Sequence, residues 1–382
     1  MRNWLLPENI EDVLPAEARR IEHIRTVLLE HFRRHGYRLV MPPMIEYLES
    51  LLTGTGEDLD LGTFKLVDQM SGRMMGLRAD ITPQVARIDA HLLNSQGITR
   101  LCYCGTVVHA RPRGLNATRE PLQLGAEIYG HAGIESDLEI QRLLRQSLCN
   151  IGLPGIRIDL GHVGIFRAIC NRGSISDSRE LRIHEMLASK DLPRLIGETV
   201  DLDQATRAAL TALPSLYGGR EVIAKARRQL PDYPRIVQAL DDLESLVGEI
   251  SGEVSIDLAD LRGYRYHSGV IFAAYIAGRA NAIALGGRYD EVGRSFGRAR
   301  PATGFSLDLR EIASVATVPD LAAGILAPWN DDTELLREID KLRGSGEVVI
   351  IDLPGHGSHR HELGCDRELA MENGQWRIRS IR

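Results

Sequence analysis

Cysteine is scarce in this chain, with five residues among 382. The number is odd and the spacing irregular: Cys102, Cys104, Cys149, Cys170 and Cys365. A disulfide framework usually has paired cysteines in a short secreted domain, whereas a chain of this length buries a core without such bonds. We therefore expect free thiols and a cytoplasmic protein.

Long apolar runs are absent as well. No segment reaches the ~18 uninterrupted apolar residues of a membrane span, and residues 1–8 contain Arg2, Trp4 and Pro7 rather than the apolar stretch of a signal peptide. We expect neither export nor membrane insertion.

An excess of positive charge is also missing. The 46 Lys and Arg residues are outnumbered by 52 Asp and Glu residues, for a net charge of −6, and the two signs are interspersed. Proteins that grip a phosphate backbone usually carry a basic balance or stripe. The composition argues against RNA as the main partner but leaves a local basic patch possible.

Hydrophobic periodicity predicts an α+β fold. Apolar residues recur at three- and four-residue steps over 15–32, which indicates an amphipathic helix that ends before Gly36. Extended segments with turns between them follow at 63–67, 73–77, 101–109 and 121–129, with a helix over 82–93. Consecutive strands of this kind favour an antiparallel sheet flanked by helices.

The later segments predict the domain organisation. Helical periods replace strands between Cys170 and Gly248, so we expect a helical insertion over about 171–248 in a core of residues 1–320. Two strands, a turn at Gly286-Gly287 and a further strand are predicted over 256–304. Residues 321–382, with helical character at 334–343 and strand character at 348–353, predict a small C-terminal α/β segment.

Two polar segments could form a ligand site. The loop 110–119 carries Arg111, Arg113 and Arg119, whose guanidinium groups suit anions, although a solvated hairpin would look the same. Gln123 and Glu127 share one face of a predicted strand, and Asp80 and Thr82 follow another. This pattern fits either a cavity for a cationic amine or the polar outer face of a sheet.

The segment Leu261 to Gly269 is dense in Arg, Tyr and His. Strand alternation would send Arg262, Tyr264, Tyr266 and Ser268 to one side and Arg265 and His267 to the other. The segment is a pocket candidate, although a histidine in such a run is often only a structural hydrogen-bonding group.

The C-terminal tail contains residue types that could bind zinc: His356, His359, His361 and Cys365. Imidazole and thiolate are suitable ligands, but the spacing matches no familiar zinc finger. We expect no metal there.

Taken in order, five segments resemble histidyl-tRNA synthetase, a class II aminoacyl-tRNA synthetase. They resemble motif 1, motif 2, the two histidine-specific motifs and motif 3, at 37–46, 103–130, 262–268, 286–290 and 304–311. The resemblance implies a class II synthetase-like fold. It also implies a histidine pocket made of Asp80, Ile81, Thr82, His109, Gln123, Glu127, Arg262, Tyr266 and His267.

The resemblance also assigns roles within this pocket. Asp80 and Glu127 would meet the α-ammonium group, Gln123 and Thr82 would orient it, and Arg262 with Tyr266 would address the carboxylate or the imidazole.

The departures from the synthetase pattern concern ATP. His109 and Arg111 stand where the resemblance implies an ATP-holding arginine and glutamate, and Glu311 stands where motif 3 implies an arginine. Arg310 is one position early, which on a helix turns the side chain by about 100°. The roughly 65 residues after Val315 are few for an anticodon-binding domain, so we expect neither aminoacylation nor tRNA binding.

This combination resembles the synthetase-like regulatory subunits of ATP phosphoribosyltransferase. Further segments that carry the resemblance are 111–115, 159–164, 264–269 and 364–369. It implies a non-catalytic chain without a cofactor, which dimerises through motif 1, joins a short catalytic subunit and takes L-histidine as effector. The alternatives are a divergent amino-acid-activating enzyme and an amino-acid-binding module for another partner.

Overall fold

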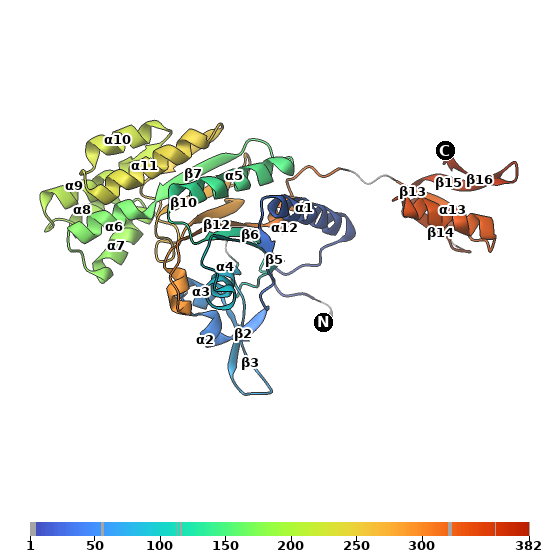
Figure 1. The fold of residues 1–382 in the computed structure, drawn as a ribbon, viewed down its shortest axis with the longest axis horizontal. Coiled ribbons are helices and arrows are strands. Elements are labelled where there is room, and N and C mark those ends of the chain that lie inside the picture. Colours follow the sequence, from blue (N-terminus) through green and yellow to red (C-terminus); the bar gives the residue numbers. More distant parts are fainter. Residues whose placement is uncertain are drawn as a thin grey trace. The chain divides into compact units, whose positions relative to one another are not determined.

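The computed structural model describes residues 5–54, 57–112, 114, 117–319, 323–355 and 357–381. The chain forms two compact units, Met1–Val318 and Pro319–Arg382 (Figure 1). Each unit has its own sheet structure and its own apolar core. No helix among the described residues is long and apolar enough to cross a membrane.

The larger unit is built on a nine-stranded sheet. Its β1–β5 and β7–β9 pairs are parallel and the other pairs antiparallel, which confirms the predicted α+β fold class. In spatial order the strands are β1 (Arg38–Leu39), β5 (Thr99–Thr106), β6 (Leu122–Tyr129), β12 (Ala302–Asp308), β11 (Ala284–Arg288), β10 (Val270–Tyr275), β7 (Arg157–His162), β9 (Glu253–Asp257) and β8 (Tyr217–Gly218).

Helix α1 (Pro15–Arg34) covers part of this sheet together with α5 (Ile134–Asn150) and α12 (Leu309–Ala313). Pro15 occupies the first turn, where its missing N–H costs no helical hydrogen bond. Four residues of the predicted apolar stripe are buried, Ile21, Ile24, Leu28 and Phe32, whereas Ala18 of the same stripe is exposed. Each fully buried side chain of this kind contributes about 1.5–3 kcal/mol, so packing of this stripe stabilises the helix.

A three-stranded sheet carries β2 (Ile45–Tyr47), β4 (Met74–Leu77) and β3 (Phe64–Val67), in that order. Pro42 and Pro43 separate β1 in the large sheet from β2 in the small one, as expected for a proline pair that cannot continue a ladder. Short helices α2 (Leu48–Leu51) and α3 (Glu57–Gly62) adjoin it. The helix predicted over 82–93 consists of α4 (Thr82–Arg87) and a π-helical turn, η1 (Ile88–Leu93).

A mainly helical segment separates β7 from β9. It comprises α6 (Val163–Arg172), α7 (Asp177–Ala188), α8 (Leu192–Glu198), α9 (Gln204–Ala212), the 3-10 turn η2 (Leu213–Ser215), α10 (Glu221–Gln229) and α11 (Pro234–Glu249). It also contains β8, which pairs with β9 and was not predicted. Two residues, one of them Gly218 at φ 141°, are too few for an alternating pattern to reveal a strand.

The Gly286-Gly287 turn was predicted wrongly, because both glycines lie inside β11. A Cβ at Gly286 would come within 2.4 Å of the Gly304 carbonyl oxygen and of the Phe272 ring. A Cβ at Gly287 would come within 2.6 Å of the Val270 carbonyl oxygen. These glycines permit close approach of neighbouring groups in the sheet and do not reverse the chain.

The strand predicted over 261–269 was also wrong. This segment forms consecutive turns before β10, with Gly263 at φ 59°, a left-handed value that glycine adopts without strain. The predicted division of its side chains between two faces therefore does not apply.

The smaller unit contains β13 (Gly324–Pro328), α13 (Thr333–Gly344), β14 (Val349–Asp352), η4 (Gly357–Leu363), β15 (Cys365–Glu372) and β16 (Gln375–Ser380). Its sheet order is β14-β13-β15-β16. Apolar residues of the sheet and of α13 form its core: Ile325, Ala327, Leu335, Ile339, Val349 and Leu369.

Candidate functional site

A cavity of about 1080 Å³ lies in the larger unit, between the sheet region and the helical segment. The described residues in its wall come from five parts of the chain. They are Gly54, Leu59, Leu61, Gly62, Asp80, Pro83, His109, Arg111, Pro112, Leu181, His184, Glu185, Gly263, Tyr264, Arg265 and Tyr266.

Glu127 lies in β6 near this cavity and is almost fully buried, with 1% of its surface exposed. Tyr103 donates a hydrogen bond to Oε1 at 3.1 Å, and Tyr289 donates one to Oε2. Burial raises the pKa of Glu127 from its ordinary value near 4.5 to about 8, although both tyrosine hydrogen bonds act to lower it. At neutral pH the Glu127 carboxyl group therefore favours its protonated form, and a cation nearby would favour the ionised form.

Asp80 and Gln123 form a hydrogen-bonded pair beside the cavity. Gln123 Nε2 donates to Asp80 Oδ1 at 2.8 Å, while Gln123 Oε1 accepts from the backbone N–H of Ile81 at 2.9 Å. The backbone N–H of Thr82 also donates to Asp80 Oδ1 at 2.9 Å, and Thr82 Oγ1 lies 2.8 Å from Tyr103 Oη. This network links Asp80 to Glu127 through hydroxyl and amide groups.

The polar face of β6 therefore looks inward. Because Glu127 is buried, the alternative of a solvent-facing polar surface does not hold at that position. The structure brings seven of the predicted pocket residues into one region: Asp80, Ile81, Thr82, His109, Gln123, Glu127 and Tyr266.

Three tyrosines of this region were not predicted from the sequence: Tyr103, Tyr129 and Tyr289. Tyr289 Oη lies 3.2 Å from Tyr129 Oη, and its ring packs 5.0 Å from the Tyr266 ring. Tyr103 lies opposite Gly125 in the β5–β6 ladder, where a Cβ would come within 2.3 Å of its hydroxyl. A tyrosine paired with a glycine on the neighbouring strand is the sequence signal that could have identified Tyr103 as a pocket residue.

The hydroxyl of Tyr266 is buried and has no hydrogen-bond partner among the described residues. Buried hydroxyl groups are normally paired, so this group is available to a ligand. Arg111 and Arg265 also line the cavity and are exposed. The site thus combines the buried carboxyl group of Glu127 and the partly buried one of Asp80 with exposed guanidinium groups.

Arg262 and His267 do not line the cavity. Arg262 Nε lies 2.8 Å from Asp260 Oδ2, and its Nη1 donates to Tyr275 Oη at 2.9 Å. Burial lowers the pKa of His267 to about 4, and His267 Nδ1 lies 3.3 Å from the Arg288 carbonyl oxygen. The family resemblance implied both placements, whereas the turns found over 261–269 leave Arg262 beside Asp260 and Tyr275 and His267 beside the Arg288 carbonyl oxygen.

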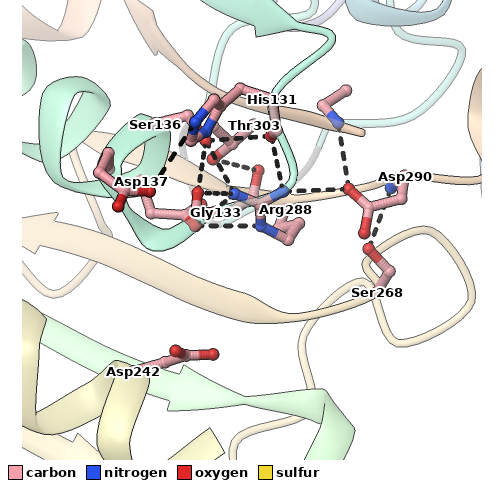
Figure 2. A network of polar contacts seen from close by, with 12 residues as sticks. His131, Gly133, Ser136, Asp137, Asp242, Ser268, Arg288, Asp290 and Thr303 are labelled. Carbon is pink, nitrogen blue, oxygen red and sulfur yellow. Dashed lines mark hydrogen bonds and ion pairs between the residues drawn. The ribbon is translucent and has the colours of Figure 1, made fainter. Parts of the chain in front are cut away.

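A buried polar network holds the end of β11 next to this site (Figure 2). Arg288 donates to Asp137 Oδ2 at 2.6 Å and to Ser136 Oγ at 2.8 Å, and also to the carbonyl oxygens of Gly133 and His131. These contacts join β11 to the start of α5. Because Tyr289 follows Arg288 directly, the network positions the Tyr289 hydroxyl that bonds Glu127.

Arg310 and Glu311 face different surroundings, as their offset on a helix predicts. Arg310 Nη1 lies 3.3 Å from the Glu120 carbonyl oxygen, and Nη2 lies 3.4 Å from that of Glu11. Glu311 lines a second cavity of about 180 Å³.

Two other sequence patterns carry residue types that are common in reaction centres. No group of three or more His, Cys, Asp or Glu side chains suited to a metal occurs in the described parts of the chain, and His356 lies outside them, as does Arg113. The sequence was expected to contain no Gly-x-Ser-x-Gly elbow, although residues 293–297 have that pattern, with Ser295 at its centre. It lies in the 3-10 turn η3 (Val292–Phe296), not in the strand-to-helix elbow of a hydrolase.

The fold and the site define a histidyl-tRNA synthetase-like protein of class II. A family model described as histidyl-tRNA synthetase matches residues 9–312. A solved histidyl-tRNA synthetase from Nostoc sp. PCC 7120 has a TM-score of 0.78 at 17% identity, over 99% of this chain and 97% of that one, and so supports the fold.

The chain belongs to the family of ATP phosphoribosyltransferase regulatory subunits. Relatives of that name are 60% identical over 380 residues in Ralstonia nicotianae (99% of this chain, 98% of the relative) and over 377 residues in Burkholderia cenocepacia (98% and 99%). A model described as the ATP phosphoribosyltransferase subunit HisZ C-terminal domain matches residues 322–379. A Bacillus halodurans structure, described as an ATP phosphoribosyltransferase regulatory subunit/histidyl-tRNA synthetase, has a TM-score of 0.83 at 26% identity, over 94% of this chain and 96% of that one.

Proposed function

We propose that this chain activates a short-form ATP phosphoribosyltransferase catalytic subunit at the first step of histidine biosynthesis, and that L-histidine bound in the large cavity is the feedback signal. The observation that carries the ligand proposal is the linked pair of Asp80 and Glu127, one in the cavity wall and one buried behind it. Two carboxyl groups with hydroxyl and amide partners suit an α-ammonium group.

The remaining groups of the cavity suit the other parts of a zwitterion. Gln123 and Thr82 orient the ammonium group, and the unpartnered Tyr266 hydroxyl meets a polar atom of the ligand. Arg111 and Arg265 bind the ligand carboxylate, in place of Arg262, which the family resemblance had assigned with Tyr266 to the carboxylate or the imidazole. His109 also lines the cavity, and its Nε2 lies 3.0 Å from the Ala79 carbonyl oxygen.

This chain carries no reaction centre of its own in the proposal. The position expected to hold a triphosphate is occupied by Glu311, and Arg310 is engaged with backbone oxygens elsewhere. A carboxylate beside a triphosphate repels it, so we propose neither aminoacylation nor tRNA as a function, and no metal or cofactor.

Feedback requires that L-histidine bind the active and inactive assemblies unequally. Couplings of about 1–3 kcal/mol suffice for a 5- to 150-fold effect. Asp80 and Tyr266 line the cavity from the core, while Leu181, His184 and Glu185 line it from α7. A ligand that contacts both the core wall and the α7 wall of the cavity can change the distance between them. Binding of the ligand would thereby shift the helical segment relative to the sheet.

We also propose a homodimer through motif 1, residues 37–46. Around this segment Leu39, Met41, Ile45 and Tyr47 are exposed, at 44%, 74%, 42% and 37%. A cluster of exposed apolar side chains on a soluble chain indicates a protein contact.

The test is phosphoribosyl-ATP formation from ATP and phosphoribosyl pyrophosphate by a short-form catalytic subunit, with and without this chain, across a titration of L-histidine. Activation that histidine suppresses supports the proposal. Glu127→Ala is expected to abolish the histidine response and to retain activation, with exposed Glu372→Ala as the control.

Absence of activation and of association would contradict the proposed partner. Amino-acid-dependent exchange of pyrophosphate into ATP would instead favour a divergent amino-acid-activating enzyme.

A further inference from the structure

The segment before α1 contains one backbone turn that contacts the loop 110–119. The N–H of Ile10 donates to the Pro7 carbonyl oxygen at 3.2 Å, which closes a turn with Glu8 and Asn9 at its centre. Asn9 has a φ of 60°, a left-handed value. Asparagine tolerates this value in a turn, whereas a β-branched residue is strained there. The identity of residue 9 therefore determines whether the turn forms without strain.

Arg119, at the end of the loop 110–119, binds the carbonyl oxygens of this turn. Its backbone N–H donates to the Asn9 carbonyl oxygen at 2.9 Å, and its Nη1 donates to that of Glu8 at 3.5 Å. Its Nε donates to the His109 carbonyl oxygen at 3.0 Å, and its own carbonyl oxygen accepts from the His109 N–H at 2.8 Å. Arg119 thus joins the turn to His109, although it is not among the described residues in the wall of either cavity.

A second arginine connects the same two segments. Arg310 Nη2 lies 3.4 Å from the Glu11 carbonyl oxygen, and Nη1 lies 3.3 Å from that of Glu120. Glu11 directly follows the turn, and Glu120 directly follows Arg119. Because two guanidinium groups hold the N-terminal segment against residues 119–120, a displacement of the turn would also displace these residues.

His109 connects Arg119 to the proposed anchor of the ligand ammonium group. His109 is 5% exposed and lines the large cavity, and its Nε2 lies 3.0 Å from the Ala79 carbonyl oxygen. The N–H of the preceding residue, Val108, donates to the Arg78 carbonyl oxygen at 2.9 Å. Both contacts fall on the two residues before Asp80, so the position of His109 affects that of the Asp80 carboxylate.

We infer that Arg119 is a positioning residue for the L-histidine site and that the turn Pro7–Ile10 holds it in place, so that the N-terminal segment determines how tightly L-histidine binds. Arg119 acts through His109 and Asp80 and not on the ligand itself. The inference rests on the proposed function, because it takes L-histidine as the ligand of the large cavity.

The first test changes the backbone preference at position 9 and keeps the carbonyl oxygen that Arg119 binds. Asn9→Val strains the left-handed conformation, and Asn9→Gly permits it. Titration calorimetry with the full chain is expected to show about fivefold weaker binding of L-histidine by Asn9→Val, and binding by Asn9→Gly within about twofold of the natural protein. Residue 9 is exposed, and melting temperatures check that both variants fold.

Asn373→Val is the matched control for this substitution. Asn373 also has a left-handed φ, 49°, and is exposed, but it lies between β15 and β16 of the smaller unit. The same strain at this position should leave L-histidine binding unchanged.

Hydrogen exchange of the Arg119 N–H gives a readout that general destabilisation would not produce. This N–H donates to Asn9, so its exchange should accelerate in Asn9→Val and not in Asn9→Gly or Asn373→Val. Because coupling between two sites is reciprocal, saturating L-histidine should slow this exchange in the natural protein. It should not slow it in Glu127→Ala, which is expected to lose the L-histidine response.

Arg119→Ala tests the side chain directly. The variant loses the contact between Nε and the His109 carbonyl oxygen and should also bind L-histidine about fivefold more weakly. Arg294→Ala, which removes an exposed arginine paired with Glu291, is the control and should bind L-histidine as the natural protein does.

Equal L-histidine binding by Asn9→Val and Asn9→Gly, or unchanged binding by Arg119→Ala, would overturn the inference and leave the proposed function intact. Failure of the natural protein to bind L-histidine would overturn both.

Discussion

Glu127 on β6 lies directly opposite Gly304 on β12, and a Cβ at position 304 would come within 1.5 Å of Glu127 Oε2. The buried carboxyl group of Glu127 thus occupies the space that a side chain at position 304 would fill, and glycine leaves this space free. The pairing explains how one sheet accommodates a buried acid in its middle.

Gly304→Ala should therefore displace Glu127 and disturb the sheet. Overpacking of this kind costs about 1–3 kcal/mol, and we expect a lower melting temperature together with loss of L-histidine binding. Differential scanning calorimetry and titration calorimetry measure the two effects. Gly248→Ala is the control, since nothing lies within 4 Å of its Cβ and the helix α11 should gain slightly. Unchanged binding in Gly304→Ala would contradict the role given to Glu127.

Glu127→Gln should stabilise the unliganded protein as pH rises. The folded-state pKa of Glu127 is raised to about 8, so its contribution to stability is fully present below about pH 4.5 and is lost progressively up to pH 8. The melting temperature of the variant should match that of the natural protein near pH 4.5 and exceed it increasingly towards pH 8. Equal melting temperatures at pH 8 would argue against a buried, uncompensated acid.

L-histidine affinity should depend on pH for the same reason. Because the ligand ammonium favours ionised Glu127, binding releases a proton from this group at pH 7, and affinity should rise between pH 6 and pH 8. Calorimetry in two buffers of different ionisation enthalpy measures the released protons. Glu127→Gln should abolish that part of the release; an unchanged proton count would assign it to another group.

Tyr264→Phe should separate binding from feedback. Tyr264 follows the cavity-lining Gly263 and donates from its hydroxyl to Glu180 on α7, while its ring packs 5.3 Å from His184. Removal of the hydroxyl leaves the ring in place. We expect the dissociation constant of L-histidine to stay within twofold and the histidine concentration for half-inhibition of the complex to rise at least twofold.

The matched control for this experiment is Tyr217→Phe. Tyr217 is 62% exposed and lies in the two-residue strand β8. If the histidine concentration for half-inhibition shifted equally in both variants, or did not shift in Tyr264→Phe, Tyr264 would have no role in coupling histidine binding to feedback.

Arg288→Lys should destabilise the larger unit. A lysine has one ammonium group and cannot reproduce the planar fork that bonds Asp137, Ser136 and two carbonyl oxygens (Figure 2). Loss of this buried network should lower the free energy of unfolding by about 3 kcal/mol in a urea titration. Arg294→Lys, in an exposed ion pair with Glu291, should change it by less than about 0.5 kcal/mol.

The parts of the fold that depend on local pattern were predictable. The stripe of Ile21, Ile24, Leu28 and Phe32 predicted the buried face of α1 because apolar spacing of three and four places side chains on one side of a helix. The alternation of Gln123 and Glu127 likewise predicted one polar strand face. Whether that face met solvent or interior was open, because alternation is identical in both cases.

The errors arose where distant contacts override local preference. Gly286-Gly287 has the composition of a turn, but the Phe272 ring and the Gly304 carbonyl oxygen occupy the space that side chains would need. The segment with Arg262 and His267 alternates like a strand, but Gly263 takes a left-handed conformation and Asp260 holds Arg262.

The sequence by itself determined the amphipathic helix α1, the extended character of segments such as β5 and β6, and the chemical types in the ligand region, since these follow from residue periodicity and composition. Tertiary structure alone decided which polar side chains are desolvated. Burial raises the pKa of Glu127 against the opposing effect of the hydrogen bonds from Tyr103 and Tyr289. Arg310 contacts Glu11 and Glu120, both distant along the chain. Desolvation depends on the whole three-dimensional environment of a group, so no local pattern of residues specifies it.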